Sequence, residues 1–137
     1  MKTLKTISLS LLVGLFLMQS ASVFAQDPVK VCPNVYKKVV LDNKRVRVIQ
    51  IEFAPGETAV WHKHPDHAVY ALTDGKLEIT DKGKKPMVAD FKEGMAFYFP
   101  AVTHMAKNIG TNTVKLVVTE IKPAGAKKMK DTPAGKK

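Results

Sequence analysis

Short runs of apolar and β-branched residues, separated by turn residues, fill the middle of the chain. The runs lie at residues 36–41, 44–53, 58–64, 68–73, 76–80, 86–90, 96–99, 105–108 and 114–122. Turn-forming pairs such as Pro55-Gly56 and Glu93-Gly94 stand between them, and no segment shows a convincing amphipathic helical period. Short strands at these intervals predict an all-β fold, an antiparallel sandwich or barrel.

The polar and apolar positions alternate cleanly in the run 76–80, where Leu77 and Ile79 share one face. In the run 44–53 the phase changes. Its large apolar residues are Val46, Val48, Ile49, Ile51 and Phe53. A bulge near Val48, or burial of that half of the strand on both faces, would explain the change. Arg45 and Arg47 alternate with the first two valines, so we expect both on a solvated face.

Asp74-Gly75 stands between the apolar runs 68–73 and 76–80. An Asp-Gly pair in this position is a strong signal for a two-residue hairpin of type I′. We therefore expect these two strands to pair with each other.

The N-terminus has the pattern of a secretory signal. Lys2 and Lys5 precede an apolar run at 7–18, and Val23-Phe24-Ala25 offers cleavage before Gln26. A membrane anchor is the alternative, but a run of about a dozen residues is short of the roughly 20 that span a bilayer. We expect residues 1–25 to be removed near Ala25-Gln26, leaving a periplasmic or secreted chain with no integral membrane segment.

The rest of the chain divides into an N-terminal segment at 26–35, one β-barrel domain at 36–122 and a basic, disordered tail at 123–137. Cys32 is the only cysteine, so no internal disulfide can form. We expect it to be a partly buried bystander, with intermolecular pairing or a metal contact as alternatives.

The net charge of +10 raises the question of nucleic-acid binding. However, many of the lysines lie in the tail, whose Pro, Gly and Ala predict disorder. An exported protein also meets little nucleic acid. We therefore expect no nucleic-acid partner, and only loose attraction to anionic envelope surfaces.

All four histidines lie near one another: His62, His64 and His67 in Trp-His-Lys-His-Pro-Asp-His, and His104 further on. Residues i and i+2 of a strand face the same way, about 6.6 Å apart. His62 and His64 can therefore bind one metal ion, with His67 and His104 as candidates for the remaining ligands. Hydrogen-bonded core histidines are the alternative, but converging imidazoles without a metal tend to leave polar nitrogens unsatisfied.

Two stretches that each begin with glycine contain these histidines. The first is Gly56, five residues and His62-Lys63-His64; the second is Gly94, five residues, Pro100, a short turn, His104, three residues and Asn108. Together they resemble the two signature motifs of the cupin superfamily, G(X)5HXH(X)3–4E(X)6G and G(X)5PXG(X)2H(X)3N. The resemblance implies a small single-domain cupin, a conical antiparallel, jelly-roll-like barrel. It also implies that His62, His64 and His104 are metal ligands, and that the protein is a homodimer.

The chain departs from these motifs in two places. The acidic ligand of the first motif is missing, and its place falls on His67 if counted from Tyr70, or on Ala68 if counted from Gly75. We follow the first count, which makes His67 a fourth ligand facing into the barrel; a solvated loop histidine is the alternative. The second motif lacks its inner glycine and is one residue short, which could tilt His104.

Neutral imidazoles suit one divalent transition metal, Fe, Cu, Ni, Co or Zn. By resemblance, the bound ion would serve a dioxygenase- or isomerase-like enzyme acting on a small organic substrate. A non-catalytic periplasmic module that binds a metal or a small ligand is the alternative. Four histidines on an octahedral ion leave two positions open, whereas on tetrahedral zinc they leave none.

The sequence assigns no catalytic residue and no organic cofactor. It contains no evident nucleophile–base pair or phosphate-binding loop. Glu57 and Asp66 are the carboxylates closest in sequence to the histidines, and we expect any general base to be one of them.

Overall fold

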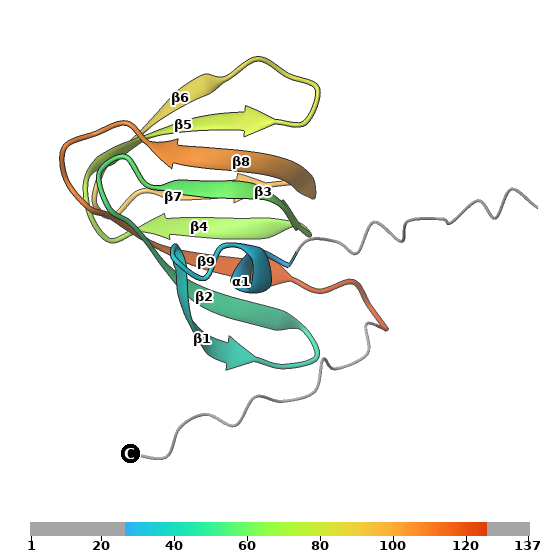
Figure 1. Cartoon of the computed structure of the whole chain (residues 1–137). Helices are drawn as coiled ribbons and strands as arrows, with labels where there is room; N and C mark the ends of the chain where they lie inside the picture. The colour runs from blue at the N-terminus through green and yellow to red at the C-terminus, as the bar shows by residue number, and fades with distance from the viewer. Residues whose placement is uncertain (1–26, 126–137) are drawn as a thin grey trace, which may run out of the picture.

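Two antiparallel sheets form the fold of residues 27–125, which are the residues that the computed structural model describes (Figure 1). The elements are α1 (Pro28–Val31), β1 (Tyr36–Asp42), β2 (Val46–Phe53), β3 (Thr58–His64), β4 (His67–Ala71), β5 (Gly75–Asp81), β6 (Met87–Phe91), β7 (Ala96–Phe99), β8 (Val102–Asn108) and β9 (Val114–Ile121). The five-stranded sheet has the order β1-β2-β9-β4-β7, and the four-stranded sheet has the order β3-β8-β5-β6. The expected signal peptide at 1–25, and the tail from residue 126 onward, lie outside the described residues.

The all-β prediction is confirmed, and each predicted run overlaps a strand. β3 and β7 have the predicted bounds, whereas β8 begins at Val102, three residues before the predicted run. The one-turn helix α1 in the N-terminal segment was not predicted. Gly56 and Gly94 lie in turns with positive φ, 77° and 84°, where glycine avoids the strain that a side chain would cause.

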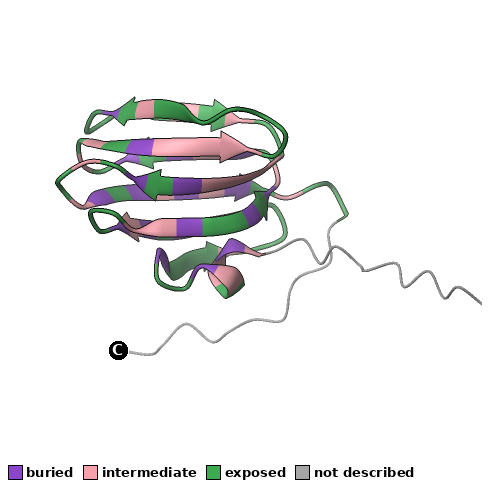
Figure 2. Ribbon diagram, turned by 45° about the horizontal axis from the view of Figure 1, so that its top comes forward, coloured by how far each residue is buried: buried purple, intermediate pink, exposed green. Residues whose placement is uncertain are grey.

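The core lies between the sheets because inward and outward positions alternate along most strands (Figure 2). β2 and β9 supply much of it, with Ile49 and Ile51 facing inward beside Leu116 and Val118. Each such side chain contributes about 1.5–3 kcal/mol on full burial. The two sheets thus form one hydrophobic core, and the histidines lie at its polar end.

The predicted hairpin at Asp74-Gly75 is wrong. β4 and β5 do not pair, because the chain crosses at this point from the five-stranded to the four-stranded sheet. Neither residue has positive φ, as a type I′ turn would require. Gly75 is needed for space instead, since a Cβ there would collide with the side chain of Val114.

The expectations for β2 are also wrong. β2 pairs with β9 without any irregularity from Val46 to Phe53, so there is no bulge near Val48. Its inward positions include Arg47, which is 9% exposed rather than solvated. The phase change arises because one inward position holds a charged residue, and buried carboxylates stabilise it there. The irregularities lie in the partner strand β1, between Tyr36 and Lys38 and between Val39 and Leu41.

The N-terminal segment closes one open side of the sandwich. α1 packs against β1 and β3, which are edge strands of different sheets. Its N-cap is Asp27, whose side chain accepts a hydrogen bond from the backbone N–H of Val29. Among residues 27–125, no helix has the length and apolar character needed to cross a bilayer.

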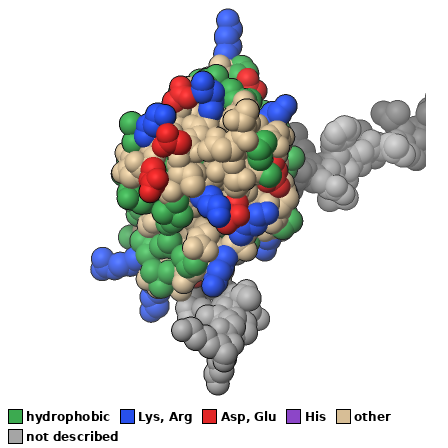
Figure 3. Space-filling model, turned by 90° about the vertical axis from the view of Figure 1, so that its left-hand side faces the viewer, with side chains coloured by type: hydrophobic (Ala, Val, Ile, Leu, Met, Phe, Trp, Pro, Cys, Tyr) green, Lys and Arg blue, Asp and Glu red, His purple; other side chains and the backbone are tan. Residues whose placement is uncertain are grey.

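Acidic and basic side chains are interspersed on the face shown in Figure 3, which lies on the left of Figure 1. Ion pairs such as Lys92–Asp74 and Lys84–Asp81 join opposite charges on the exposed surface. No histidine is visible on this face.

Candidate metal centre

A bulge in β3 brings His62 to the inner face. β3 pairs with β8 as Ala59 with Ala106 and then His62 with His104, so the intervening Val60 and Trp61 together oppose one residue. Both of these residues face outward, 52% and 39% exposed. One extra residue reverses the phase of a strand. Ala59 and His62 therefore both face the core, and His64 follows two residues later.

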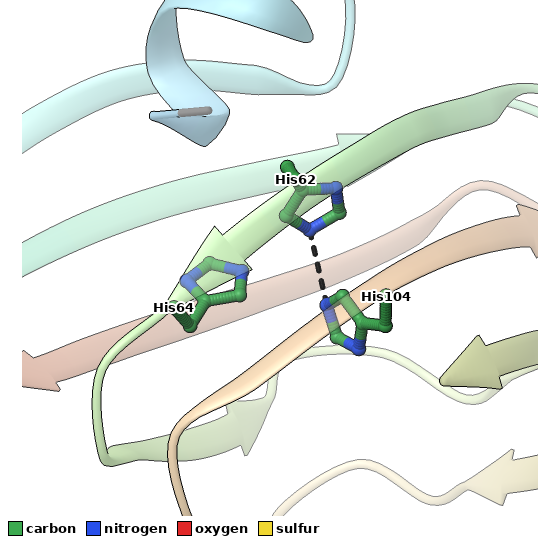
Figure 4. Close-up of side chains that lie close together, drawn as sticks. All are labelled: His62, His64 and His104. Carbon is green, nitrogen blue, oxygen red and sulfur yellow. Dashed lines mark hydrogen bonds between the residues drawn. The ribbon is translucent and has the colours of Figure 1, made fainter. Parts of the chain in front are cut away.

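Three histidines converge between the sheets (Figure 4). His62 and His64 of β3 are 0% and 1% exposed, and His104 of β8 is their partly buried neighbour. The Nε2 atoms of His62 and His104 lie 3.0 Å apart. One nitrogen from each ring lies within 4.8 Å of the other two. The short turn after Pro100 therefore does not prevent His104 from reaching the cluster.

Hydrogen bonds fix the tautomers of three imidazoles. The Nδ1 atoms of His62, His64 and His67 lie 2.6, 2.7 and 2.8 Å from the Val60 carbonyl, the Glu120 carboxylate and the Pro65 carbonyl respectively. These oxygens can only accept, so each Nδ1 must hold the proton. Each Nε2 then presents a lone pair, as a metal ligand requires.

His67 is buried, 2% exposed, and stacks on Phe99, so it is not the solvated loop histidine of the alternative prediction. It faces inward together with Val69 and Ala71, as expected. Its ring centre lies 4.6 Å from that of His64 and 6.5 Å from that of His104. His67 thus borders the cluster next to His64, and its role as a ligand stays a prediction.

A buried ionic chain supports His64. Glu120 accepts from His64 Nδ1 at 2.7 Å and from Arg47 Nε at 2.7 Å. The two terminal nitrogens of Arg47 donate to the Asp27 carboxylate at 3.0 and 3.1 Å. Burial alone would raise the pKa of Glu120, but the hydrogen bonds from His64 and Arg47 lower it overall. Likewise, burial opposes the charge of Arg47, yet its two carboxylate partners raise its pKa. Both groups therefore stay charged beneath the histidines.

Tyr36 also reaches the cluster, from the first position of β1. Its hydroxyl oxygen lies 2.7 Å from His62 Nε2 and 2.9 Å from His64 Nε2. Burial, followed by the neighbouring Cys32 and Glu120, raises the pKa of this phenol well above its usual value. The free phenol therefore keeps its proton.

The hydrogen bonds of the converging atoms do not balance. Among residues 27–125, every buried side-chain nitrogen or oxygen lies near a partner. However, the Nε2 atoms of His62 and His64 hold lone pairs, so the only protons for their three short contacts come from Tyr36 and His104. The contacts are those of Tyr36 with His62, Tyr36 with His64, and His104 with His62. Two protons cannot serve three contacts, so in one of them two lone pairs face each other. A cation at this point would remove the conflict, so the donor set fits a transition metal.

Burial keeps His62, His67 and His104 neutral. Burial, together with the neighbouring His64, lowers the pKa of His62 to about 4. Burial, followed by the neighbouring His62, His64 and His67, lowers the pKa of His104 to about 2. Burial lowers the pKa of His67 as well. At neutral pH these rings are free to bind a cation.

The carboxylates expected to act as bases have structural roles. Glu57 accepts from the backbone N–H of Ala54 and from Asn34. Asp66 accepts from the Tyr98 hydroxyl and from the backbone N–H of Ala101. These hydrogen bonds connect the β3–β4 turn to the β7–β8 turn.

Asp81 is the carboxylate near the accessible edge of the cluster. Its Oδ1 lies 4.0 Å from His104 Nδ1, and the two side chains are 24% and 15% exposed. Sequence spacing gave no sign of this, because Asp81 lies outside both motifs. Its position opposite His104 follows from the pairing of β5 with β8.

Cys32 is fully buried behind His62. Its sulfur lies 3.9 Å from Nδ1, on the side of the ring away from the converging Nε2 atoms, and 3.6 Å from the Val60 carbonyl. Burial raises the pKa of this thiol. This position fits neither intermolecular pairing nor the metal contact that we considered.

Asn108, the last residue of the second motif, forms hydrogen bonds to the backbone of turns and does not contact the histidine cluster. Its amide donates to the carbonyls of Phe53 and Asn112 at 3.0 and 2.8 Å, and its oxygen accepts from the backbone of Gly110 at 2.9 Å. It is fully buried. It thereby stabilises the end of the barrel where β8 ends, whereas His104 lies near the other end of that strand.

The sequence also resembles known proteins. Residues 49–120 match the family described as cupin domain. The chain is 38% identical over 95 residues to the β-alanine degradation protein BauB of Pseudomonas aeruginosa, which covers 66% of this chain and 96% of that protein.

Solved structures agree with this match. A cupin domain of Bordetella pertussis superposes with a TM-score of 0.59 at 30% identity, over 63% of this chain and 91% of that one. An RmlC-like cupin family protein of Methanocaldococcus jannaschii, with a double-stranded β-helix fold, gives a TM-score of 0.53 at 20% identity, over 61% and 76%. The solved structures show the same fold, and the family match over residues 49–120, with the 38% identical relative, establishes that the chain belongs to the cupin domain family.

Proposed function

We propose that this cupin binds one divalent transition-metal ion through the Nε2 atoms of His62, His64 and His104, with His67 as a further ligand. The observation that supports it most strongly is the fixed tautomer of the imidazoles, which directs lone pairs toward one point. Without a cation, that arrangement places lone pairs against each other. Neutral imidazoles suit Fe, Cu, Ni, Co or Zn.

We further propose that the metal serves an enzyme acting on a small organic substrate. A bound ion of this kind would polarise an oxygen atom of the substrate. The chain's own residues would orient it: Glu120 and Arg47 hold His64 in place, and the cluster opens to solvent on the side of His104. Asp81 stands at that opening and is the side chain best placed to take or give a proton.

The relative from P. aeruginosa is named for β-alanine degradation. β-Alanine has a carboxylate that could reach a metal, and a site of neutral histidines leaves the full charge of the ion available to an anion. Small carboxylates are therefore the first substrate class to screen. Turnover of one of them, lost in His104→Ala, would support the enzymatic role.

A non-catalytic module that stores or senses a metal is the second candidate. The observation in its favour is the burial of the cluster, since His62, His64 and His67 are at most 2% exposed. Closed sites are typical of structural metals, and open sites of catalytic ones. Slow removal of the metal by a chelator, with no substrate effect on its spectrum, would favour this candidate.

The primary test is elemental analysis of the chain purified without a histidine tag, beside His62→Ala/His64→Ala. We expect close to one metal ion per chain in the first protein and none in the variant. Lys63→Ala is the matched control, because Lys63 lies between the two ligands but faces outward. No metal in any of the three proteins after reconstitution would overturn the proposal.

We also propose that the chain is exported and dimeric. Cell fractionation with N-terminal sequencing tests the first point, with cleavage expected before Gln26. Sedimentation of the mature protein tests the second. A chain that keeps residues 1–25 in the cytoplasm would overturn export, and a monomer at all concentrations would overturn dimerisation.

A further inference from the structure

We propose that the hydroxyl oxygen of Tyr36 is a direct metal ligand, which gives the histidine cluster an oxygen donor from outside the cupin motifs. This inference rests on the proposed metal site. Tyr36 precedes the family match, which begins at residue 49, and neither motif includes it. The residues of the motifs alone would give a site with nitrogen donors only.

The distances among the donor atoms support this. The oxygen lies 2.7 Å from His62 Nε2 and 2.9 Å from His64 Nε2, and the Nε2 atoms of His62 and His104 are 3.0 Å apart. Ligands in adjacent positions around one ion lie about 2.8–3.4 Å apart when their bonds to it are about 2.0–2.1 Å. The distances of 2.9 and 3.0 Å fall in this range and that of 2.7 Å lies just below it, so the oxygen and the nitrogens are spaced closely enough to be neighbouring ligands.

The proton balance supports it independently. The phenol has one proton, and two unprotonated Nε2 atoms lie within hydrogen-bonding distance of it. It can donate to only one of them, so its other contact is repulsive in the absence of a cation. When the oxygen binds a metal, its proton is released to solvent. His62, His64 and Tyr36 then all direct lone pairs at the same ion.

The backbone holds Tyr36 in this place. Its N–H donates to the Cys32 carbonyl at 2.9 Å, and its Cα pairs with that of Ile51 across β1 and β2. The side chain is 5% exposed and its ring packs edge-on against His62, with centres 5.3 Å apart. The oxygen therefore cannot turn to solvent unless the N-terminal segment moves.

No carboxylate competes for this position. The buried Glu120 is engaged by His64 Nδ1 and Arg47, on the far side of the His64 ring from Nε2. Asp81 lies on the Nδ1 side of His104. Among the side chains of residues 27–125 that contact the cluster, Tyr36 thus supplies the oxygen nearest to the converging Nε2 atoms.

The test uses iron as the probe, loaded as Fe(II) and oxidised to Fe(III). A phenolate ligand gives Fe(III) a charge-transfer band in the visible range, with phenolate vibrations in the resonance Raman spectrum. We expect this band in the wild-type chain and its loss in Tyr36→Phe, with iron still bound by the histidines. We also expect Tyr36→Phe to weaken iron binding at least about tenfold.

Tyr98→Phe is the matched control, because Tyr98 is exposed and bonds only to Asp66. The chain has three tyrosines, so a Tyr70→Phe/Tyr98→Phe variant retains Tyr36 alone and must keep the band. This second variant makes the test independent of whether Tyr36→Phe folds.

The outcomes separate the two proposals. Iron bound without the band, or a band lost in Tyr70→Phe/Tyr98→Phe, would overturn the role of Tyr36 and leave the metal site intact. A wild-type chain that binds no iron and no other transition metal would overturn both.

Discussion

The two motif stretches between residues 56 and 108 and the N-terminal segment at 27–36 contribute to the same site in different ways. The motifs supply the imidazoles, at spacings that follow from the geometry of one strand and one cross-strand pair. The N-terminal segment and the first residue of β1 supply Asp27 and Tyr36. Tyr36 contacts His62 and His64 directly, whereas Asp27 acts on His64 only through Arg47 and Glu120. The comparison teaches that motif spacing identifies the candidate ligands, whereas the groups that set their surroundings can come from anywhere in the chain.

Removing a ligand from the motif region should have the largest effect. We expect His104→Ala to lower metal affinity by more than about 100-fold, beyond the 10–100-fold that loss of a supporting partner costs. Competition with a chelator measures this. Thr103→Ala, its neighbour on β8, is the control and should bind as the wild type does. An unchanged affinity in His104→Ala would mean that the motif does not form the site.

The buried ionic chain should have the next largest effect. Glu120→Ala leaves Arg47 without its main partner, and we expect the free energy of unfolding to fall by about 3–5 kcal/mol. We also expect metal affinity to fall about 10–100-fold, because His64 loses the acceptor that fixes its tautomer. Urea denaturation and metal titration measure the two effects.

The control for this variant is Glu52→Ala. Glu52 pairs with Lys115 at 3.7 Å on an exposed face of the same sheet, where an ion pair contributes less than about 1 kcal/mol. Equal losses for Glu52→Ala and Glu120→Ala would contradict a special role for the buried chain.

Acid should destabilise the metal-free protein. The pKa of His62 falls from its usual 6.5 to about 4 on folding, so between these values the unfolded chain binds more protons. The free energy of unfolding therefore decreases as the pH falls through this window, by about 2 kcal/mol for His62 alone at about pH 5. Urea denaturation after chelator treatment, at pH values on both sides of the window, tests this. The pH dependence should be weaker in His62→Ala, and an equal dependence would argue against the burial of His62.

The smallest effect is expected in the N-terminal segment. Asp27→Asn keeps the cap of α1 but weakens the ion pair with Arg47, so we expect a loss of about 1 kcal/mol in the free energy of unfolding. Asp90→Asn is the control, since Asp90 forms an exposed pair with Lys76 at 3.4 Å. If thermal denaturation gives no difference between them, the segment stabilises the site only through packing.

Much of the fold was predictable because strand signals are local. The runs and turn residues gave the strands, and the spacing of His62, His64 and His104 gave the cluster. Arg47 was assigned to the wrong face because its partners are 20 and 73 residues away in the sequence. Arg47 shares a face of the strand with Ile49, Ile51 and Phe53. A charged residue in line with these apolar ones was the signal in the sequence, and it indicated a buried ion pair rather than a bulge.

The Asp74-Gly75 prediction failed for a related reason. The dipeptide identifies a turn, but it cannot say whether the next strand pairs with the previous one or crosses to the other sheet. Val114 decides this by packing against Gly75, and it belongs to a strand almost 40 residues away. The dipeptide fixed the position of the turn, and packing fixed which of the two sheets the next strand joins.

The sequence by itself determined the number and approximate bounds of the strands, the family, and the histidines that can bind a metal. These depend on periods of two residues and on spacings within a few residues, which the chain shows directly. Only the tertiary structure decided the bulge that turns His62 inward, the tautomers of the imidazoles, and the approach of Tyr36 and Glu120. These depend on register between distant strands, where a shift of one residue exchanges the inner and outer faces.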